Sequence, residues 1–146
     1  GPKSGITVSA INTLILLFVF PGSLPTGPLY NFAAVLAMLL GIYIPYRLAT
    51  HGCKTENLGN YLRQHVALIS ISATALGIVL RTLLMTVFNY FALQQPYPIG
   101  FSFSQSGVLL FLPLGAIFNA TIALYTIPIA IAVTLAISSR TKITVK

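Results

Sequence analysis

Four long apolar runs divide the sequence, and they constrain its fold more than any other feature. Each run is about as long as the roughly 20 apolar residues that an α-helix needs to cross a bilayer. Only 6% of the 146 residues are charged and the mean hydropathy is +0.91, whereas about a quarter of the residues of a soluble domain are charged. The sequence therefore predicts an all-α fold, a polytopic transmembrane helix bundle that forms one domain over residues 1–146.

The predicted spans cover residues 6–24, 29–47, 61–93 and 106–139. Residues 21–28 and 94–106 contain prolines and glycines but no charge, so we expect two uncharged loops there. No proline interrupts residues 61–93. One long helix is therefore favoured over two short spans that break near Gly77.

The positions of the cations predict the orientation of the chain. Seven of the eight Lys and Arg residues lie before the first span, between the second and third spans, or after the fourth: Lys3, Arg47, Lys54, Arg63, Arg140, Lys142 and Lys146. Cytoplasmic segments carry the excess of Lys and Arg in membrane proteins. We therefore expect a multi-pass protein of the cell membrane with both termini and the 47–63 loop in the cytoplasm.

The sequence offers little material for catalysis. Its single acid, Glu56, has no carboxylate partner, and His51 and His65 have no Cys, Asp or Glu at metal-ligand spacing. The cations form no basic stripe interleaved with aromatic residues, as a nucleic-acid groove would require. We expect no enzyme activity, metal, cofactor or nucleic acid, and we expect membrane lipid and a small-molecule ligand as partners.

Polar residues recur at the predicted outer ends of the helices. Buried amides require hydrogen-bond partners in lipid, and a cleft lined by amides and aromatic rings binds neutral, ring-containing solutes. The candidate substrate-binding residues are Asn31, Asn89, Tyr90, Tyr97 and Asn119, with Gln95, Phe101 and Phe103 beside them. The alternative is that each amide holds helices together or caps a helix end.

Small residues spaced by four, Ala33, Ala37 and Gly41, predict a close helix contact. They either pack this bundle internally or dock a partner membrane protein. Arg81 falls within the third predicted span, so we expect it to face the bundle interior, water or a carboxylate of a partner chain.

Several stretches together resemble the substrate-binding S components of energy-coupling factor (ECF) vitamin transporters, particularly the riboflavin type. The shared features are a Gly-Pro-x-x-Gly opening at residues 1–5, Asn-Phe at 31–32 before a small-residue helix, Met-Thr-x-x-Asn-Tyr at 85–90, Pro-Tyr at 96–97 and Phe-Asn at 118–119. Their order and spacing carry the resemblance over most of the chain.

The resemblance implies a membrane-embedded subunit that binds a vitamin from outside, while a transmembrane coupling protein and two ATPase subunits power its uptake. Such S components have six helices, and this chain resembles the last four. By similarity, Asn89 and Asn119 are the ligand-binding candidates. The alternative function is a structural or assembly subunit of a larger membrane complex or filament.

Overall fold

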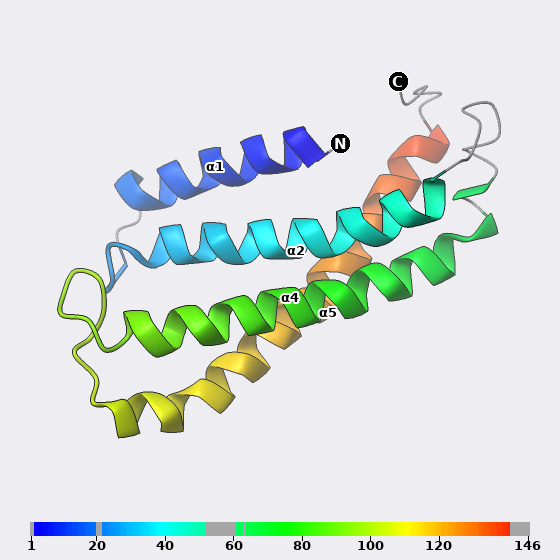
Figure 1. The fold of residues 1–146 in the computed structure, drawn as a ribbon. Helices are drawn as coiled ribbons and strands as arrows, with labels where there is room; N and C mark the ends of the chain where they lie inside the picture. Colours follow the sequence, from blue (N-terminus) through cyan, green and yellow to red (C-terminus); the bar gives the residue numbers. More distant parts are fainter. Residues whose placement is uncertain (1, 20–21, 52–60, 63, 141–146) are drawn as a thin grey trace.

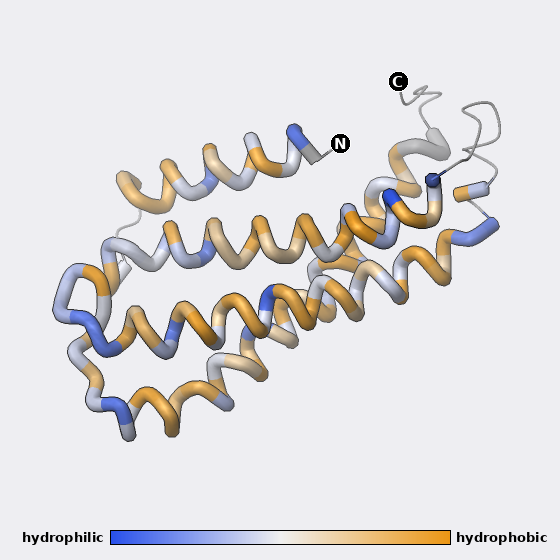
Figure 2. Tube along the Cα trace, in the orientation of Figure 1, coloured by the Kyte–Doolittle hydropathy of each residue, from blue (hydrophilic) through white to orange (hydrophobic). Residues whose placement is uncertain are grey.

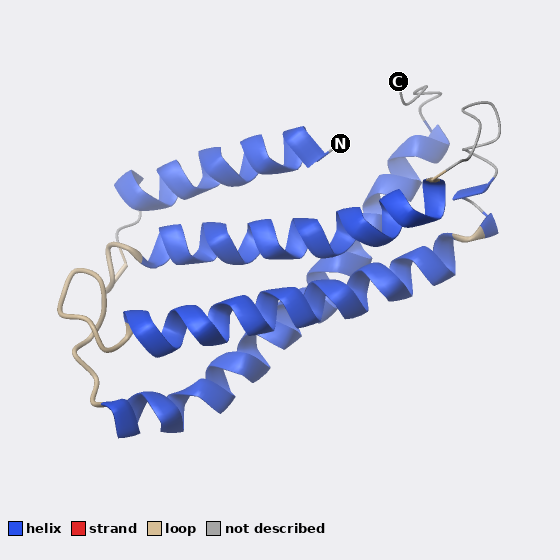
Figure 3. Ribbon diagram, viewed as in Figure 1, coloured by secondary structure: helices blue, strands red, loops and turns tan. Residues whose placement is uncertain are grey.

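The computed structural model describes residues 2–19, 22–51, 61–62 and 64–140, and all regular structure within them is helical (Figure 3). The four main helices are α1 (Pro2–Val19), α2 (Gly27–Thr50), α4 (Val66–Ala92) and α5 (Gln105–Arg140). The all-α prediction is therefore confirmed for the part of the chain that the structure describes.

Three of the helices lie side by side in antiparallel order and the fourth crosses behind them (Figure 1). α1 packs mainly on α2, α2 packs along α4, and α5 crosses behind α4 at an angle. The start of α1, the ends of α2 and α5 and the start of α4 therefore lie at one end of the bundle. The segments that join α1 to α2 and α4 to α5 lie at the other end.

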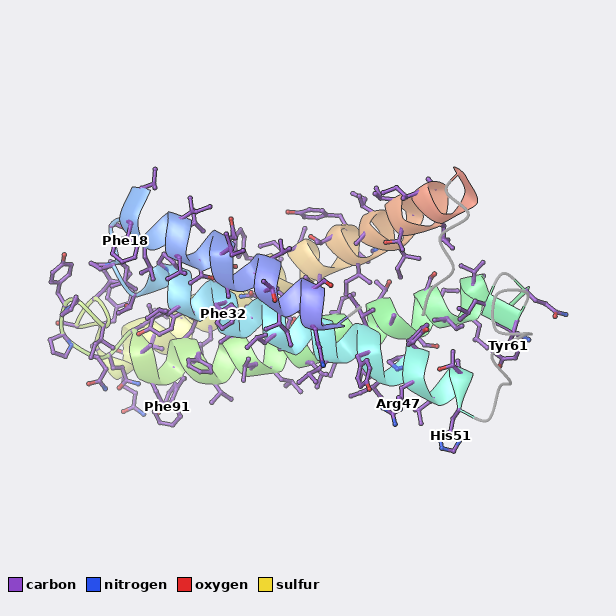
Figure 4. All side chains as sticks on the ribbon, turned by 90° about the horizontal axis from the view of Figure 1, so that it is seen from above. Phe18, Phe32, Arg47, His51, Tyr61 and Phe91 are labelled. Carbon is purple, nitrogen blue, oxygen red and sulfur yellow. The ribbon has the colours of Figure 1, made fainter. Side chains whose placement is uncertain are left out.

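Hydrophobic residues dominate all four helices, and hydrophilic residues gather at the ends and in the loops (Figure 2). Among the described residues, three helices are long and apolar enough to cross a membrane: Gly27–Thr50, Val66–Ala92 and the Gln105–Ile137 part of α5. This arrangement is compatible with a multi-pass membrane protein. Side chains labelled in Figure 4 mark the two ends, with Arg47, His51 and Tyr61 opposite Phe18 and Phe91.

The prediction of four spans is wrong for the first one. α1 has 18 residues, which at about 1.5 Å each give a rise of roughly 27 Å, less than the roughly 30 Å hydrocarbon core. The predicted span 6–24 included Ser23 and Leu24, but these residues lie in the connection before α2. Pro25 and Pro28 favour a turn and a new helix start rather than a continued helix.

The other three predicted spans each correspond to one helix. Within the predicted third span, 61–93, α4 passes through Gly77 without interruption but begins only at Val66. Tyr61, Leu62 and Gln64 are also helical, and a turn at His65 separates them from α4, so the predicted single helix is too long at its start. α2 and α5 extend slightly beyond the predicted spans 29–47 and 106–139. Pro113 and Pro128 both lie inside α5, and neither divides the helix into two spans.

Two glycines allow a close contact between helices α2 and α4. A Cβ atom added to Gly41 on α2 would collide with the Cα of Gly77 on α4, and one added to Gly77 would collide with Cδ1 of Ile127 on α5. Met38, Ala73 and Ala123 join Ile127 in the buried cluster beside this contact. Helices α2, α4 and α5 therefore approach one another at Gly41 and Gly77, two positions that have no side chain.

We predict that Gly41→Ala lowers the stability of the purified protein by about 1–3 kcal/mol, because the added methyl group forces α2 away from α4. Thermal unfolding in detergent, followed by far-ultraviolet circular dichroism, measures the effect. Gly22→Ala is the matched control, since a Cβ at Gly22 meets no atom within 4 Å. Equal unfolding midpoints for the two variants would contradict the packing described.

Candidate functional site

Arg81 lies in the interior of the bundle, where α2, α4 and α5 meet. Its side chain is only 3% exposed. The guanidinium Nε donates a hydrogen bond to Oδ1 of Asn119 on α5 at 3.1 Å, and Nη1 lies 3.9 Å from Sδ of Met38 on α2. A single charged side chain thus contacts both helices that flank α4.

Asn119 connects Arg81 to the backbone of α5. It is 5% exposed, and its Nδ2 donates a hydrogen bond to the carbonyl oxygen of Gly115 at 2.9 Å. Both polar atoms of the Asn119 side chain are therefore paired within the protein. An amide suits this position because its oxygen accepts from Arg81 while its nitrogen donates to the preceding helical turn.

Gly115 also brings Asn89 to the same interface. The Nδ2 atom of Asn89 lies 3.2 Å from the position that a Cβ of Gly115 would take, so the missing side chain leaves room for the amide. We call Arg81 and Asn89 on α4 together with Gly115 and Asn119 on α5 the polar seam. It runs along the α4–α5 contact from the centre of the bundle towards the 93–104 loop.

Thr82 adds a hydroxyl group with an unsatisfied hydrogen-bonding capacity. Its Oγ1 is buried and has no hydrogen-bond partner among the described residues. Thr82 and Asn89 are seven residues apart on α4, so they occupy the same face of the helix two turns from each other. Asn89 lies against α5 on that face.

The loop of residues 93–104 is tied to the beginning of α2. The hydroxyl groups of Thr26 and Tyr30 donate hydrogen bonds to the carbonyl oxygens of Pro98 and Ile99 at 2.9 and 2.8 Å, respectively. Gly100 is required in this loop because a Cβ there would collide with the carbonyl oxygen of Ala92. These contacts fix the loop over the end of the bundle to which the seam leads.

Of the five predicted substrate-binding residues, the structure brings Asn89 and Asn119 together at Gly115. Tyr90 lies next to them, and its hydroxyl accepts a hydrogen bond from Nε2 of Gln105 at 3.2 Å. Asn31 is half-buried near the start of α2. Tyr97 is 68% exposed in the 93–104 loop, well outside the buried part of the seam.

A surface hollow of about 400 Å³ lies beside this end of the bundle. Its walls come from the end of the 93–104 loop and the first turns of α5, and they include Phe103 and Phe111. The rings of Phe101 and Phe103 stack with centroids 5.8 Å apart. None of the five predicted substrate-binding residues lines the hollow, so the predicted amide cleft and this aromatic hollow are separate features.

The residues predicted for helix packing lie on α2. Ala37 and Gly41 are buried and Ala33 is half-buried, and Gly41 makes the close contact with Gly77. Arg81 lies within the bundle interior, one of the three environments expected for it. Its hydrogen-bonded partner is an amide of its own chain.

Sequence analysis missed Met38, Thr82 and Gly115 as members of this region. Gly115 has a recognisable signal, because it precedes Asn119 by four residues, the spacing at which a side chain can donate to a helix carbonyl. Met38 follows Ala34 by four residues on the small-residue face of α2. Thr82 has no signal beyond its position next to Arg81.

The seam combines one guanidinium and two amides within an apolar bundle. These groups donate and accept hydrogen bonds, and none of them is a nucleophile paired with a base. The arrangement is suited to binding or to holding helices together.

Comparison of the chain with protein-family models, with curated proteins and with solved structures found no match.

We predict that Asn119→Ala destabilises the protein by about 1–3 kcal/mol, because it leaves the buried Nε of Arg81 without an acceptor. Thr121→Ala is the control, since its hydroxyl is exposed and bonds only to the carbonyl oxygen of Ile117 in its own helix. Thermal unfolding in detergent measures both changes. An Asn119→Ala midpoint no lower than that of Thr121→Ala would rule out a stabilising role for the Arg81–Asn119 bond.

Proposed function

We propose that this chain is a membrane-embedded solute-binding subunit that takes part in the uptake of a neutral aromatic small molecule such as a riboflavin-like vitamin. The observation that carries the proposal is the polar seam, which places two amides on one helix interface beneath a loop rich in aromatic residues. Separate ATPase subunits, joined through a transmembrane coupling protein, power transport in this proposal, as in the ECF transporters whose S components the sequence resembles.

The seam and Tyr90 have complementary roles in this proposal. Asn89 is half-buried, and its side-chain amide can form hydrogen bonds with the polar edge of a ring, as acceptor through Oδ1 and as donor through Nδ2. Tyr90, the residue next to Asn89 on α4, offers an aromatic face on which a planar ring stacks. Amides and aromatic faces bind a neutral ring without moving a charged group out of water. The proposed solute is therefore neutral.

Asn89 is a better candidate for a direct ligand contact than Asn119. The Asn119 amide is buried and both of its polar atoms are already paired with Arg81 and Gly115. Asn89 lies nearer to the 93–104 loop along α4. We therefore assign Asn89 to solute contact and Asn119 to positioning of the seam.

Titration with riboflavin tests this assignment. The chain contains no tryptophan, so the fluorescence of the flavin can be followed without overlap from indole. We predict saturable binding by the wild-type protein and about fivefold weaker binding by Asn89→Ala, the effect of losing one hydrogen bond of about 1 kcal/mol. Lumichrome and other neutral vitamins extend the same titration.

Asn12→Ala supplies the matched control for this titration. Asn12 is an exposed amide on α1, a helix that packs mainly on α2 and takes no part in the seam. Its substitution should leave the dissociation constant unchanged. The proposal fails if no neutral aromatic vitamin binds saturably, or if the Asn12 and Asn89 variants bind equally well.

The orientation proposed for the chain places the end with Arg47 in the cytoplasm and the 93–104 loop outside, following the distribution of cations. Cys53, the only cysteine, then reacts with a membrane-impermeant maleimide only after the cells are permeabilised. Ser23→Cys, introduced into a Cys53→Ser background, reacts in intact cells. The opposite pattern of labelling would reverse the orientation.

A second function, assembly within a larger membrane complex, is favoured by the exposure of α1. This helix presents Val8, Leu14 and Phe18 on its surface together with the amide of Asn12. An amide in an apolar helix gains stability by pairing with another helix. Asn12→Leu disrupts assembly under this second function and leaves riboflavin binding intact under the first.

A further inference from the structure

No carboxylate balances the charge of Arg81 among the described residues. Glu56 is the only acid in the sequence, and it lies between α2 and α4, outside both helices and outside the described residues. Arg81 is 3% exposed and is surrounded by apolar helices. A buried guanidinium stays charged in proteins, so its burial is costly unless an opposite charge is near.

The neutral partners of Arg81 use only part of its capacity to donate. A guanidinium carries five N–H groups in a planar fork. Within the described part of the chain, Nε donates to Asn119 and Nη1 faces the weak acceptor Sδ of Met38, while no acceptor is found for Nη2. The buried hydroxyl of Thr82, the next residue on α4, is also without a partner there.

From this combination we propose that Arg81 and Thr82 form a binding site for a small monovalent anionic group, a carboxylate or a halide. Arg81 supplies the charge and the N–H donors that remain, and the Thr82 hydroxyl supplies one further donor. Asn119 acts as a positioning residue, because its bond to Nε fixes the orientation of the guanidinium plane. The site lies deeper in the bundle than the aromatic loop, and it does not depend on the binding of a neutral solute.

The burial of Arg81 selects a small ligand over a partner helix. Asn119 on α5 and Met38 on α2 flank the guanidinium, and Arg81 is only 3% exposed, so a carboxylate carried on a neighbouring helix has little surface of Arg81 to contact. A free anion, or the anionic end of a small molecule, needs only a path between side chains. The net charge of +7 also favours the approach of anions to the protein.

Thermal unfolding of the purified full-length protein in detergent, with ionic strength held constant by sodium sulfate, tests the proposal. Benzoate, its neutral analogue benzamide, and chloride are the three probes. The site predicts a saturable rise in the unfolding midpoint with benzoate and none with benzamide. A rise with benzoate alone identifies an organic carboxylate, and a rise with chloride identifies an inorganic anion as a ligand of the same site.

Substitutions assign the effect to Arg81. Arg81→Met should weaken anion binding at least tenfold. Met38→Glu places a carboxylate against the guanidinium and should likewise abolish the response to anions, whereas Met38→Gln, of similar size and neutral, should retain it. The comparison of Met38→Glu with Met38→Gln tests the role of Arg81 in anion binding even if Arg81→Met does not fold. The proposal is overturned if neither benzoate nor chloride stabilises the wild-type protein, or if Met38→Glu and Met38→Gln respond alike.

Discussion

The hydrogen bond between Arg81 and Asn119 is the interaction on which the arrangement of the three longest helices depends. It places a charged group in the interior of an apolar bundle, where every donor without a partner costs free energy. α5 must therefore keep the register against α4 that places Asn119 beside Arg81, and α2 must bring Met38 to the other side of the guanidinium. Gly41 and Gly77 make this geometry possible because they let α2 and α4 approach closely.

Much of the fold follows from the pattern of apolar runs, proline and charge. The sequence predicted all four helices and the uncharged loops, and it predicted a single helix through Gly77. It overestimated the first span because hydropathy alone carried that run to Leu24, whereas the chain around Pro25 turns into a second helix. The length of an apolar run and the length of the helix it forms are different quantities when proline lies near the end.

The site was harder to predict than the fold because it depends on the register between helices distant in sequence. Asn89 and Asn119 were both identified from their unusual polarity, but nothing local indicates that Gly115 brings them to one interface. The same limitation applies to Arg81, whose amide partner is 38 residues away. Tyr97 was grouped with these residues from its place in an aromatic loop. That loop bonds to Thr26 and Tyr30 on α2, and Tyr97 remains exposed.

The central claim is that Arg81 and Asn119 act as a coupled pair that organises the polar seam. A double-mutant cycle with Arg81→Met, Asn119→Ala and the combined variant, followed by reversible unfolding in mixed micelles, tests it most directly. The account predicts a coupling free energy of about 1.5–3 kcal/mol, the range for a hydrogen bond to a charged group. Additive effects of the two substitutions, with a coupling near zero, would contradict it.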